Sequence, residues 1–402
     1  MQTRTGLNME KVFLCTAFKL CDNNGYLTTQ LANFFRCNNL ELVRDPEEAD
    51  TIVITTCGFD QEREDESAAL VNHYHDKYEG SKEVIVSGCL TKINPDAFKP
   101  GLTLIGNKEL NLFNDRFNAR ERIEQVPGSD LSNEYISDEY GFIDAYYIQI
   151  CQGCVNNCSY CAIKKSKGYV DSKPVEEILL EVRRGIDLGF KRFMLLGDDC
   201  GSYGVDLGCD LAQLLNRLTA YDIRILINYI EPGKFLSVYP KIDSSALEMI
   251  DFMNIPVQAA SPRIIGLMNR SYDPQRVMEA AWEIKERFPA VYLETHIIFG
   301  FPGETREEFR ETLRLADCFD AVIYFRYTDR KGVRSTSLPG KVSEEELQQR
   351  IDEIVAHPRF TWKQQDAVPP LVLLGYGPET SELFNTLRLK EKIIASENGN
   401  HN

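Results

Sequence analysis

The sequence has no long apolar run and no excess of positive charge. No stretch approaches the roughly 18 consecutive apolar residues of a transmembrane helix, and the polar N-terminus, residues 1–11, lacks the apolar core of a signal peptide. Basic residues number 45 against 61 acidic ones, a formal charge of −16. Nucleic-acid-binding proteins usually carry a basic footprint, so this balance argues against a polyanionic partner. We expect a cytoplasmic protein with no membrane partner.

Nothing in the sequence suggests disulfides, although cysteine is frequent. Twelve cysteines without a secretory signal point to a reducing cytosol and to metal binding. The 402 residues are enough for two or three domains with a sizeable core.

Three of the cysteines are closely spaced on one short segment. They are Cys154, Cys158 and Cys161, with Tyr160 before the last. Thiolates this close along one loop can face a soft metal centre, and three of them on a four-iron cubane leave one iron open for a small chelating ligand. A zinc knuckle is the alternative, because Cys151 could complete the four ligands of zinc. The strand before the loop and the motifs after it favour a [4Fe-4S] cluster, with Cys151 as a bystander.

Strands alternate with helices in a first domain, residues 1–118. Strands are expected at 11–15, 51–56, 84–87 and 102–105, and helices at 28–35 and 62–78. This alternation predicts a doubly wound parallel sheet in an α/β domain.

A cysteine follows each of the first three strands of this domain. Cys21 comes a few residues after the first strand, Cys57 directly after the second, and Cys89 shortly after the third. Because the loops at the carboxyl edge of a parallel sheet lie together and bind ligands, the three thiolates can converge on a second cluster. Three unrelated buried cysteines, which are common in cores, are the alternative.

A polar, acidic segment at 119–142 is expected to be a linker to a second α/β domain at 143–356. Strands are expected there at 145–150, 192–196, 223–227, 252–256, 291–298 and 321–325, and helices at 174–187, 274–288 and 307–317. About six such repeats suggest a partial (β/α)6 barrel, in which function lies at the carboxyl ends of the strands. Residues 357–402 would form a short C-terminal extension, with a strand at 371–374 and a helix at 381–395.

The spacing Cys154-x3-Cys158-x2-Cys161, with its aromatic residue, resembles the cluster motif of the radical S-adenosylmethionine (SAM) superfamily. Within it, the chain resembles the methylthiotransferase family, and the resemblance runs over residues 11–352. The segments that carry it, in family order, are 21–26, 49–57, 87–89, 203–206, 255–261, 267–272, 295–305 and 327–332.

The resemblance implies an enzyme that inserts sulfur at an unactivated C–H bond and methylates it, with two SAM molecules per turnover. It implies a radical-generating [4Fe-4S] cluster on Cys154, Cys158 and Cys161, which cleaves SAM to a 5′-deoxyadenosyl radical. It implies an auxiliary [4Fe-4S] cluster on Cys21, Cys57 and Cys89, whose sulfur the other SAM methylates. The expected SAM contacts are Tyr160, Gly197, Asp198 and Gln258. The catalytic residues stay unknown, and an electron donor such as flavodoxin or ferredoxin is implied.

The chain departs from the family pattern at a few positions near the expected pockets. Lys164 and Lys167 stand where the family has Pro and Arg, His296 where it has Asp, and Ala260 where it has Gly. None of these changes removes a cluster ligand, but each bears on the SAM or the substrate pocket.

The substrate is the least determined part of the resemblance. Known members end in a small RNA-binding domain called TRAM, which is not recognisable in residues 357–402. With the charge of −16, this favours a peptide or protein substrate over tRNA. The alternatives are a tRNA methylthiotransferase forming 2-methylthio-adenosine derivatives, and a radical SAM enzyme or iron–sulfur protein without sulfur insertion.

Overall fold

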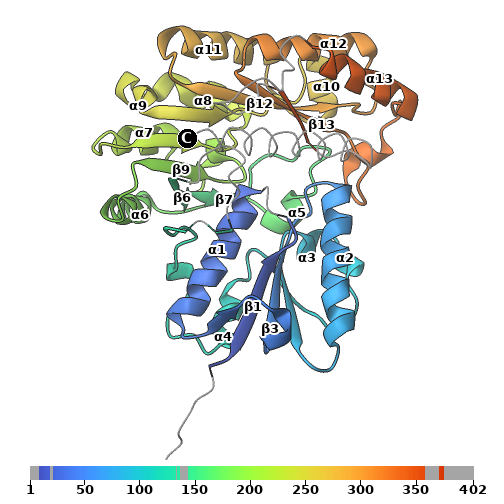
Figure 1. Cartoon of the computed structure of the whole chain (residues 1–402). Coiled ribbons are helices and arrows are strands. Elements are labelled where there is room, and N and C mark those ends of the chain that lie inside the picture. The colour runs from blue at the N-terminus through green and yellow to red at the C-terminus, as the bar shows by residue number, and fades with distance from the viewer. Residues whose placement is uncertain (1–8, 19–20, 133, 136–143, 358–370, 375–402) are drawn as a thin grey trace, which may run out of the picture. The chain divides into compact units, whose positions relative to one another are not determined.

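The computed structural model describes residues 9–18, 21–132, 134–135, 144–357 and 371–374 (Figure 1). The chain divides into two compact units, one made of residues 1–155 and 161–226, the other of residues 156–160 and 227–402. Each unit is described by itself. None of the helices in the described ranges has the length and apolar composition that crossing a bilayer requires.

The N-terminal part of the first unit is built on a parallel sheet of five strands in the order β2-β1-β3-β4-β5. The strands are β1 (Lys11–Thr16), β2 (Glu41–Val43), β3 (Thr51–Thr56), β4 (Glu83–Gly88) and β5 (Thr103–Ile105). The helices are α1 (Asp22–Cys37), α2 (Gln61–Tyr78), α3 (Leu90–Ile93) and α4 (Asn111–Arg116), and the 3-10 turns are η1 (Pro46–Glu48), η2 (Pro95–Ala97) and η3 (Ile123–Gln125). All six residues of β3 are buried, as expected of the central strand of a covered sheet.

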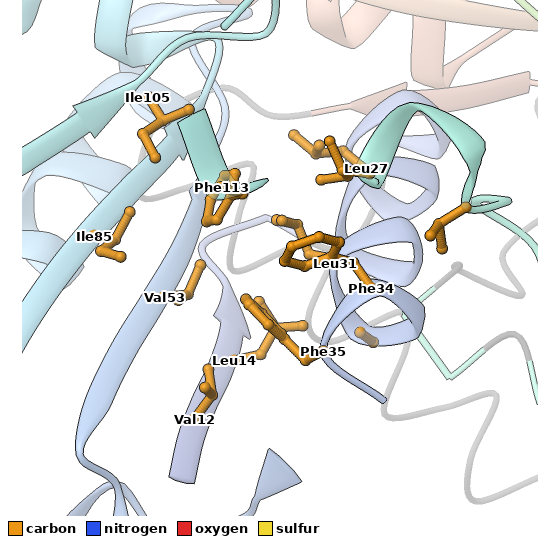
Figure 2. Packing of buried hydrophobic residues seen from close by; sticks show 13 residues of the cluster. Val12, Leu14, Leu27, Leu31, Phe34, Phe35, Val53, Ile85, Ile105 and Phe113 are labelled. Atoms are coloured by element: carbon orange, nitrogen blue, oxygen red, sulfur yellow. The ribbon is translucent and has the colours of Figure 1, made fainter. Parts of the chain in front are cut away.

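Side chains of β1 alternate between the two faces of this sheet. Val12 and Leu14 belong to a core that includes Leu31, Phe34, Phe35 and Phe113 (Figure 2). Phe13 points the other way and contacts Tyr74 of α2, with ring centroids 5.8 Å apart. Because successive residues of a strand face opposite sides, α1 and α2 cover opposite faces, which is the doubly wound arrangement (Figure 1).

The rest of the first unit carries three strands in the order β10-β9-β6, of which β6 and β9 pair in parallel, a two-stranded antiparallel pair and several short helices. The strands are β6 (Ala145–Gln149), β7 (Cys151–Gln152), β8 (Asp171–Ser172), β9 (Arg192–Leu196) and β10 (Arg224–Ile227), the last of which ends at the unit boundary. The helices are α5 (Lys164–Lys167), α6 (Val175–Asp187) and α7 (Leu211–Leu218), with the 3-10 turn η4 (Cys200–Ser202).

The second unit has four parallel strands in the order β14-β13-β12-β11. They are β11 (Ile250–Asn254), β12 (Tyr292–Phe299), β13 (Ala321–Arg326) and β14 (Leu371–Leu374). The helices are α8 (Pro232–Val238), α9 (Ser244–Glu248), α10 (Pro262–Leu267), α11 (Pro274–Arg287), α12 (Arg306–Leu313) and α13 (Glu344–Val355), with η5 (Tyr239–Lys241), η6 (Arg314–Asp317) and η7 (Arg334–Ser337).

The α/β class, with parallel sheets in both predicted domains, is confirmed. Two differences have local causes. Helix α1 begins at Asp22, six residues before the predicted start, because the backbone N–H groups of Asn24 and Gly25 donate to the carbonyl of Cys21 at 2.9 and 2.8 Å. Strand β2 was not predicted, because it is only three residues long and its pairing with β1 is not visible in a local sequence pattern.

The segments that flank the barrel strands are only partly described. In the predicted linker, Ile123 and Val126 are buried in the N-terminal core. The strand at 371–374 is present as β14, whereas the predicted helix at 381–395 lies outside the described residues. The domain boundaries at 118, 142 and 356 stay predictions.

Candidate metal centres and cofactor site

The three N-terminal cysteines lie at neighbouring strand ends of one sheet edge. Thr56 of β3 pairs with Gly88 of β4, so Cys57 and Cys89 each follow a paired strand end. The backbone N–H of Cys89 donates to Thr56 at 3.2 Å. Cys21 occupies the N-cap position of α1, and its side chain makes no capping hydrogen bond there. The β-α-β succession therefore delivers the three thiols to the same edge.

Burial and the neighbouring thiols both raise the pKa of two of these cysteines. Burial raises the pKa of Cys21 to about 12, and Cys89 adds to this effect. The pKa of the Cys57 thiol lies well above its ordinary value, mainly because the thiol is buried and in addition because Cys21 and Cys89 disfavour its negative charge. Charge–charge effects of this kind require proximity inside a poorly screened interior.

The donor set fits a cluster better than a single ion. Within the described part of the chain, no group of three or more His, Cys, Asp or Glu side chains could hold one metal ion. Cysteines that bind a cubane are attached to different irons, so their sulfurs stay apart. Three neighbouring thiols with no carboxylate or imidazole among them are the ligand chemistry of an iron–sulfur cluster.

The amide side chain of Asn107 connects this sheet edge with α5, which follows the cysteine-containing loop at residues 150–161 (the cluster loop). Nδ2 of Asn107 lies 3.5 Å from Sγ of Cys89 and donates to Oγ of Ser166 at 2.9 Å. The next residue, Lys167, is only 4% exposed. Asn107 follows β5 at the carboxyl edge, so the reasoning that selected the cysteines could also have selected it.

In the first unit, the cluster loop is held by backbone contacts around Cys154. Gly153 has φ of +83°, and a Cβ there would lie 2.3 Å from the carbonyl oxygen of Tyr169, so only glycine fits. Nζ of Lys164 donates to the carbonyl of Cys154. Sγ of Cys154 lies 3.7 Å from Oδ2 of Asp199, a buried carboxylate that the sequence did not single out.

Residues 156–160 of the loop are anchored within the second unit. Ser159 donates from its backbone N–H to Met268 at 2.9 Å and from its hydroxyl to Leu267 at 2.8 Å. The guanidinium of Arg270 lies 5.9 Å from the ring centre of Tyr160. Burial opposes the charge of Arg270, but Tyr160, Tyr272 and Cys158 raise its pKa overall. A largely buried cation therefore contributes to the surroundings of Cys158, the second thiol of the loop.

Cys151 is buried beside Cys200 rather than in the exposed part of the loop. A Cβ on Gly197 would lie 2.7 Å from Sγ of Cys151 and 3.2 Å from Sγ of Cys200. The pKa of the Cys151 thiol lies well above its ordinary value, mainly because the thiol is buried and in addition because Cys200 and Asp199 disfavour its negative charge. These contacts fit Cys151 as a packed thiol.

The predicted SAM contacts other than Tyr160 follow strands, two of them in the first unit and one in the second. In the first unit, the carbonyl of Gly197 accepts a bond of 3.3 Å from Nδ2 of Asn23. The carboxylate of Asp198 accepts a bond of 2.7 Å from the backbone N–H of Gly153. In the second unit, Gln258 has φ of +70°, a strained value for glutamine. Its buried Oε1 has no hydrogen-bond partner among the described residues, which fits an acceptor that awaits a ligand.

His296 sits in a buried polar group of the second unit. Its Nε2 lies 2.8 Å from Nδ2 of Asn254 and 3.2 Å from Oε1 of Glu294. His296 and Glu294 both lie in β12, and Asn254 ends β11, so the residue that replaces the aspartate of the family pattern contacts one residue of its own strand and one of the neighbouring strand. The sequence did not indicate that Asn254 and Glu294 contact His296, because a single Asn or Glu in a strand carries no recognisable motif.

The segment 300–304 forms a tight turn around a buried ion pair. The backbone N–H of Gly300 donates to Oε2 of Glu304 at 2.7 Å, and Arg350 of α13 donates to both the carboxylate and the carbonyl of Glu304. Thr305 then caps α12 through a reciprocal capping box with Glu308.

Comparison with known proteins decides the family. The radical SAM superfamily model matches residues 148–316, and the model of the uncharacterized protein family UPF0004 matches residues 18–103. A ribosomal protein uS12 methylthiotransferase RimO of Chlorobium luteolum is 31% identical over 347 residues, which cover 83% of this chain and 77% of that one. A probable threonylcarbamoyladenosine tRNA methylthiotransferase of Pyrococcus horikoshii is 30% identical, covering 76% and 75%. This chain belongs to the radical SAM methylthiotransferase family.

Solved structures support the fold of this methylthiotransferase. The radical SAM methyltransferase TsrM of Kitasatospora setae aligns with a TM-score of 0.56 at 13% identity, covering 82% of this chain and 77% of that one. The cofactors of the methylthiotransferase family are SAM and two [4Fe-4S] clusters.

Proposed function

We propose that this methylthiotransferase acts on a peptide or protein residue, converting C–H to C–S–CH3, in the reducing cytoplasm. The observation that carries the sulfur-insertion part is the arrangement of Cys21, Cys57 and Cys89. They are three buried or half-buried thiols at neighbouring strand ends that influence one another's pKa. The radical-generating cluster is already accounted for by Cys154, Cys158 and Cys161, so this second thiol group is available for a separate role such as holding the sulfur donor.

The residues divide into two groups by the cofactor that we propose they hold. Cys154, Cys158 and Cys161 would hold the radical-generating cluster, and Cys21, Cys57 and Cys89 the auxiliary cluster. When bound, these cofactors supply the electron, the radical and the sulfur. The chain supplies the surroundings, and the burial of Cys57 at 4% exposure excludes water from chemistry that water would quench.

We propose that the protein side of the SAM site is polar at defined atoms. Oε1 of Gln258 would accept a hydrogen bond from SAM, since it has no partner in the described chain. Oδ2 of Asp198 accepts the hydrogen bond from Gly153. We propose that the other carboxylate oxygen, Oδ1, faces the SAM ammonium. Tyr160 of the second unit and Gly197 of the first are the other two residues that we propose for SAM contact. An electron donor such as flavodoxin or ferredoxin would reduce the radical-generating cluster.

The charge of the chain favours a peptide or protein over tRNA. The formal charge of −16 repels a polyanion, and phosphate contacts dominate most nucleic-acid affinities. The second candidate, tRNA, is favoured by the similarity to a probable tRNA methylthiotransferase.

Two measurements test this function. Anaerobic reconstitution and iron counting should give about eight irons per chain, whereas about four would contradict sulfur insertion. Incubation with candidate peptides and with purified tRNA, followed by a mass search for a gain of S plus CH2, identifies the substrate. Restored 2-methylthio-adenosine in a strain lacking its own tRNA enzyme would overturn the peptide assignment alone.

A further inference from the structure

The segment that carries the cluster loop is basic, although the chain as a whole is acidic. Of the 402 residues, 61 are acidic and 45 are basic. Residues 145–170, which contain the cluster loop and α5, have no Asp or Glu and carry three lysines, Lys164, Lys165 and Lys167. A surface whose charge is opposite to that of the rest of the protein attracts a partner that the rest of the protein repels.

Two lysines of the first unit are held in fixed positions around Tyr169. Nζ of Lys108 donates to the carbonyl of Tyr169 at 3.1 Å. Nζ of Lys164 donates to the carbonyl of Cys154 and lies 5.5 Å from the ring centre of Tyr169. Lys165, next along α5, is exposed. These contacts fix the positions of charges that would otherwise move on flexible side chains.

Tyr169 itself is an exposed aromatic residue next to the cluster loop. Its side chain is 55% exposed. The backbone N–H of Cys154 donates to the carbonyl of Gly168, the residue before Tyr169, at 3.3 Å. One hydrogen bond therefore joins this exposed segment to a residue that we propose as a ligand of the radical-generating cluster. Exposed tyrosines are typical of surfaces that bind another protein.

Carboxylates of the same unit also border this surface. Oε1 of Glu109 lies 2.6 Å from Nζ of Lys92, so this pair is neutral. Oδ2 of Asp206 accepts a bond of 2.8 Å from the backbone N–H of Ser172, and Asp171 is exposed at the start of β8. The three lysines on and beside α5 outnumber the two carboxylates that remain, so the surface stays positive.

We infer that Lys108, Lys164 and Lys165, together with Tyr169, form the docking surface for the electron donor, and that this donor is a flavodoxin. The inference rests on the proposed function and deepens it, because it assigns a surface to that partner. A flavodoxin is acidic and exposes the edge of a planar flavin, which suits an aromatic ring surrounded by lysines. Weak electron-transfer contacts are small, so a surface of a few residues is sufficient.

The step that this surface serves is the transfer of one electron. The anionic flavin hydroquinone loses the electron and becomes the neutral semiquinone, and the oxidised radical-generating cluster gains it. No proton moves, and no covalent bond forms or breaks. Dithionite supplies the same electron without a docking surface, so the two reductants separate docking from the later chemistry.

The test compares charge-reversal variants of the full-length, reconstituted protein. Lys108→Glu and Lys165→Glu are combined in one variant. Lys191→Glu is the matched control, because Lys191 is also exposed but directly precedes β9, at the amino end of that strand. Each protein is mixed anaerobically with a purified bacterial flavodoxin in its hydroquinone form, and oxidation of the flavin is followed by stopped-flow absorbance. Calorimetry measures the binding of oxidised flavodoxin.

We expect the double variant to oxidise flavodoxin at least about tenfold more slowly at low salt, and to bind it at least about tenfold more weakly, because two attractive charges become repulsive. The difference should shrink in 1 M salt, where the Debye length is about 3 Å. Lys191→Glu should match the parent. With dithionite, all three proteins should form 5′-deoxyadenosine at the same rate. Parent rate and affinity in the double variant would overturn the inference.

Two further measurements fix the partner and the role of the ring. Tyr169→Ala should slow the reaction with flavodoxin, and it should leave the reaction with a reduced ferredoxin, which has no flavin, unchanged. A parent protein that accepts electrons from ferredoxin but not from flavodoxin would overturn the assignment to flavodoxin. If the double variant takes up less iron than the parent, Lys108→Gln with Lys165→Gln replaces it in the same assays.

Failure of the proposed function gives a different result. The parent would then form no 5′-deoxyadenosine with dithionite. Calorimetry with flavodoxin would still decide the docking surface, since it requires no turnover. Binding that the two charge reversals weaken would support the surface, and equal binding by the parent and the double variant would contradict it.

Discussion

The carboxylate of Asp198 lies 2.7 Å from the backbone nitrogen of Gly153. Gly153 directly precedes Cys154, so Asp198 fixes the start of the cluster loop and also stands at the strand end where we propose the SAM ammonium. The two roles separate chemically, because an asparagine can still accept the Gly153 hydrogen bond but carries no charge.

Asp198→Asn should therefore keep the iron content of the parent and bind SAM about tenfold or more weakly, as loss of a charge-assisted hydrogen bond predicts. Asp198→Ala should in addition lose iron, since the loop is no longer held. Equilibrium SAM binding and iron analysis on both variants measure this. Parent affinity in Asp198→Asn would restrict Asp198 to holding the loop.

Single replacement of Cys154, Cys158 or Cys161 by Ala should abolish formation of 5′-deoxyadenosine, because each thiol is proposed to ligate the radical-generating cluster. The product is measured by chromatography after reduction with dithionite. Cys37→Ala is the control, since Cys37 is exposed and matches no motif. A Cys161→Ala protein that forms the product at the parent rate refutes the assignment.

Joint replacement of Cys21, Cys57 and Cys89 by Ala should leave SAM cleavage largely intact and stop sulfur insertion. The iron content should fall by about four per chain, the content of one cubane. Iron analysis and the mass of the product report the two effects, and Cys318→Ala, a buried thiol outside both groups, is the control. Sulfur insertion in the triple variant is the outcome that excludes the auxiliary role.

Gly88→Ala should destabilise the first unit and reduce iron binding at Cys89. Gly88 has φ of +101°, and a Cβ there would lie 2.5 Å from the carbonyl oxygen of Thr56. Gly80→Ala is a matched control, because Gly80 also has a positive φ, of +72°, but open space around it. We expect about 1 kcal/mol for Gly80→Ala from backbone strain and at least about 2 kcal/mol for Gly88→Ala, measured by denaturant unfolding. Equal losses would show that the close approach to Thr56 is readily relieved.

Glu308 should make the stability of the second unit depend on pH. Its carboxylate accepts hydrogen bonds from Ser261 at 2.7 Å and from Arg263 at 2.9 Å. Partial burial opposes its ionisation, but Arg263 and Ser261 prevail and lower its pKa to about 2. A pKa that is lower in the folded than in the unfolded chain stabilises the fold above the ordinary glutamate range, and this stabilisation is lost as the pH falls toward 2.

Glu308→Gln should lower the free energy of unfolding by about 1–3 kcal/mol at pH 7 and by much less near pH 2. Urea unfolding of the second unit at both pH values measures this. Glu307→Gln, at an exposed position of the same helix, is the control. A loss of the same size at both pH values would assign the effect to packing rather than charge.

The sequence was sufficient for features that depend on local pattern. Cys57 and Cys89 follow strands whose apolar runs are unmistakable, and β9 and α2 lie within one residue of their predicted bounds. The segment around Cys21 was harder, because Asn23, Asn24 and Gly25 are typical of a turn, whereas the structure has a helix there. Local propensity is weak evidence when capping and tertiary contacts oppose it.

The remaining site features depend on contacts between distant residues. Asn107 meets Ser166 across 59 positions, and Asp199 meets Cys154 across 45. Neither pairing leaves a periodic signal in one sequence. The burial of Lys167 also follows from tertiary packing, since a lysine in a run of lysines otherwise indicates a solvated surface.

The hydrogen bond from Asn23 to Gly197 joins residues 174 positions apart. On the ribosome, which extends the chain from its N-terminus at about 5–20 residues per second, the thiol of Cys21 is made long before Gly197 leaves the exit tunnel. The surroundings of the auxiliary site therefore cannot be completed while the first domain is being synthesised. A cluster held by Cys21, Cys57 and Cys89, as we propose, would therefore have its full surroundings only after about half of the chain has been translated.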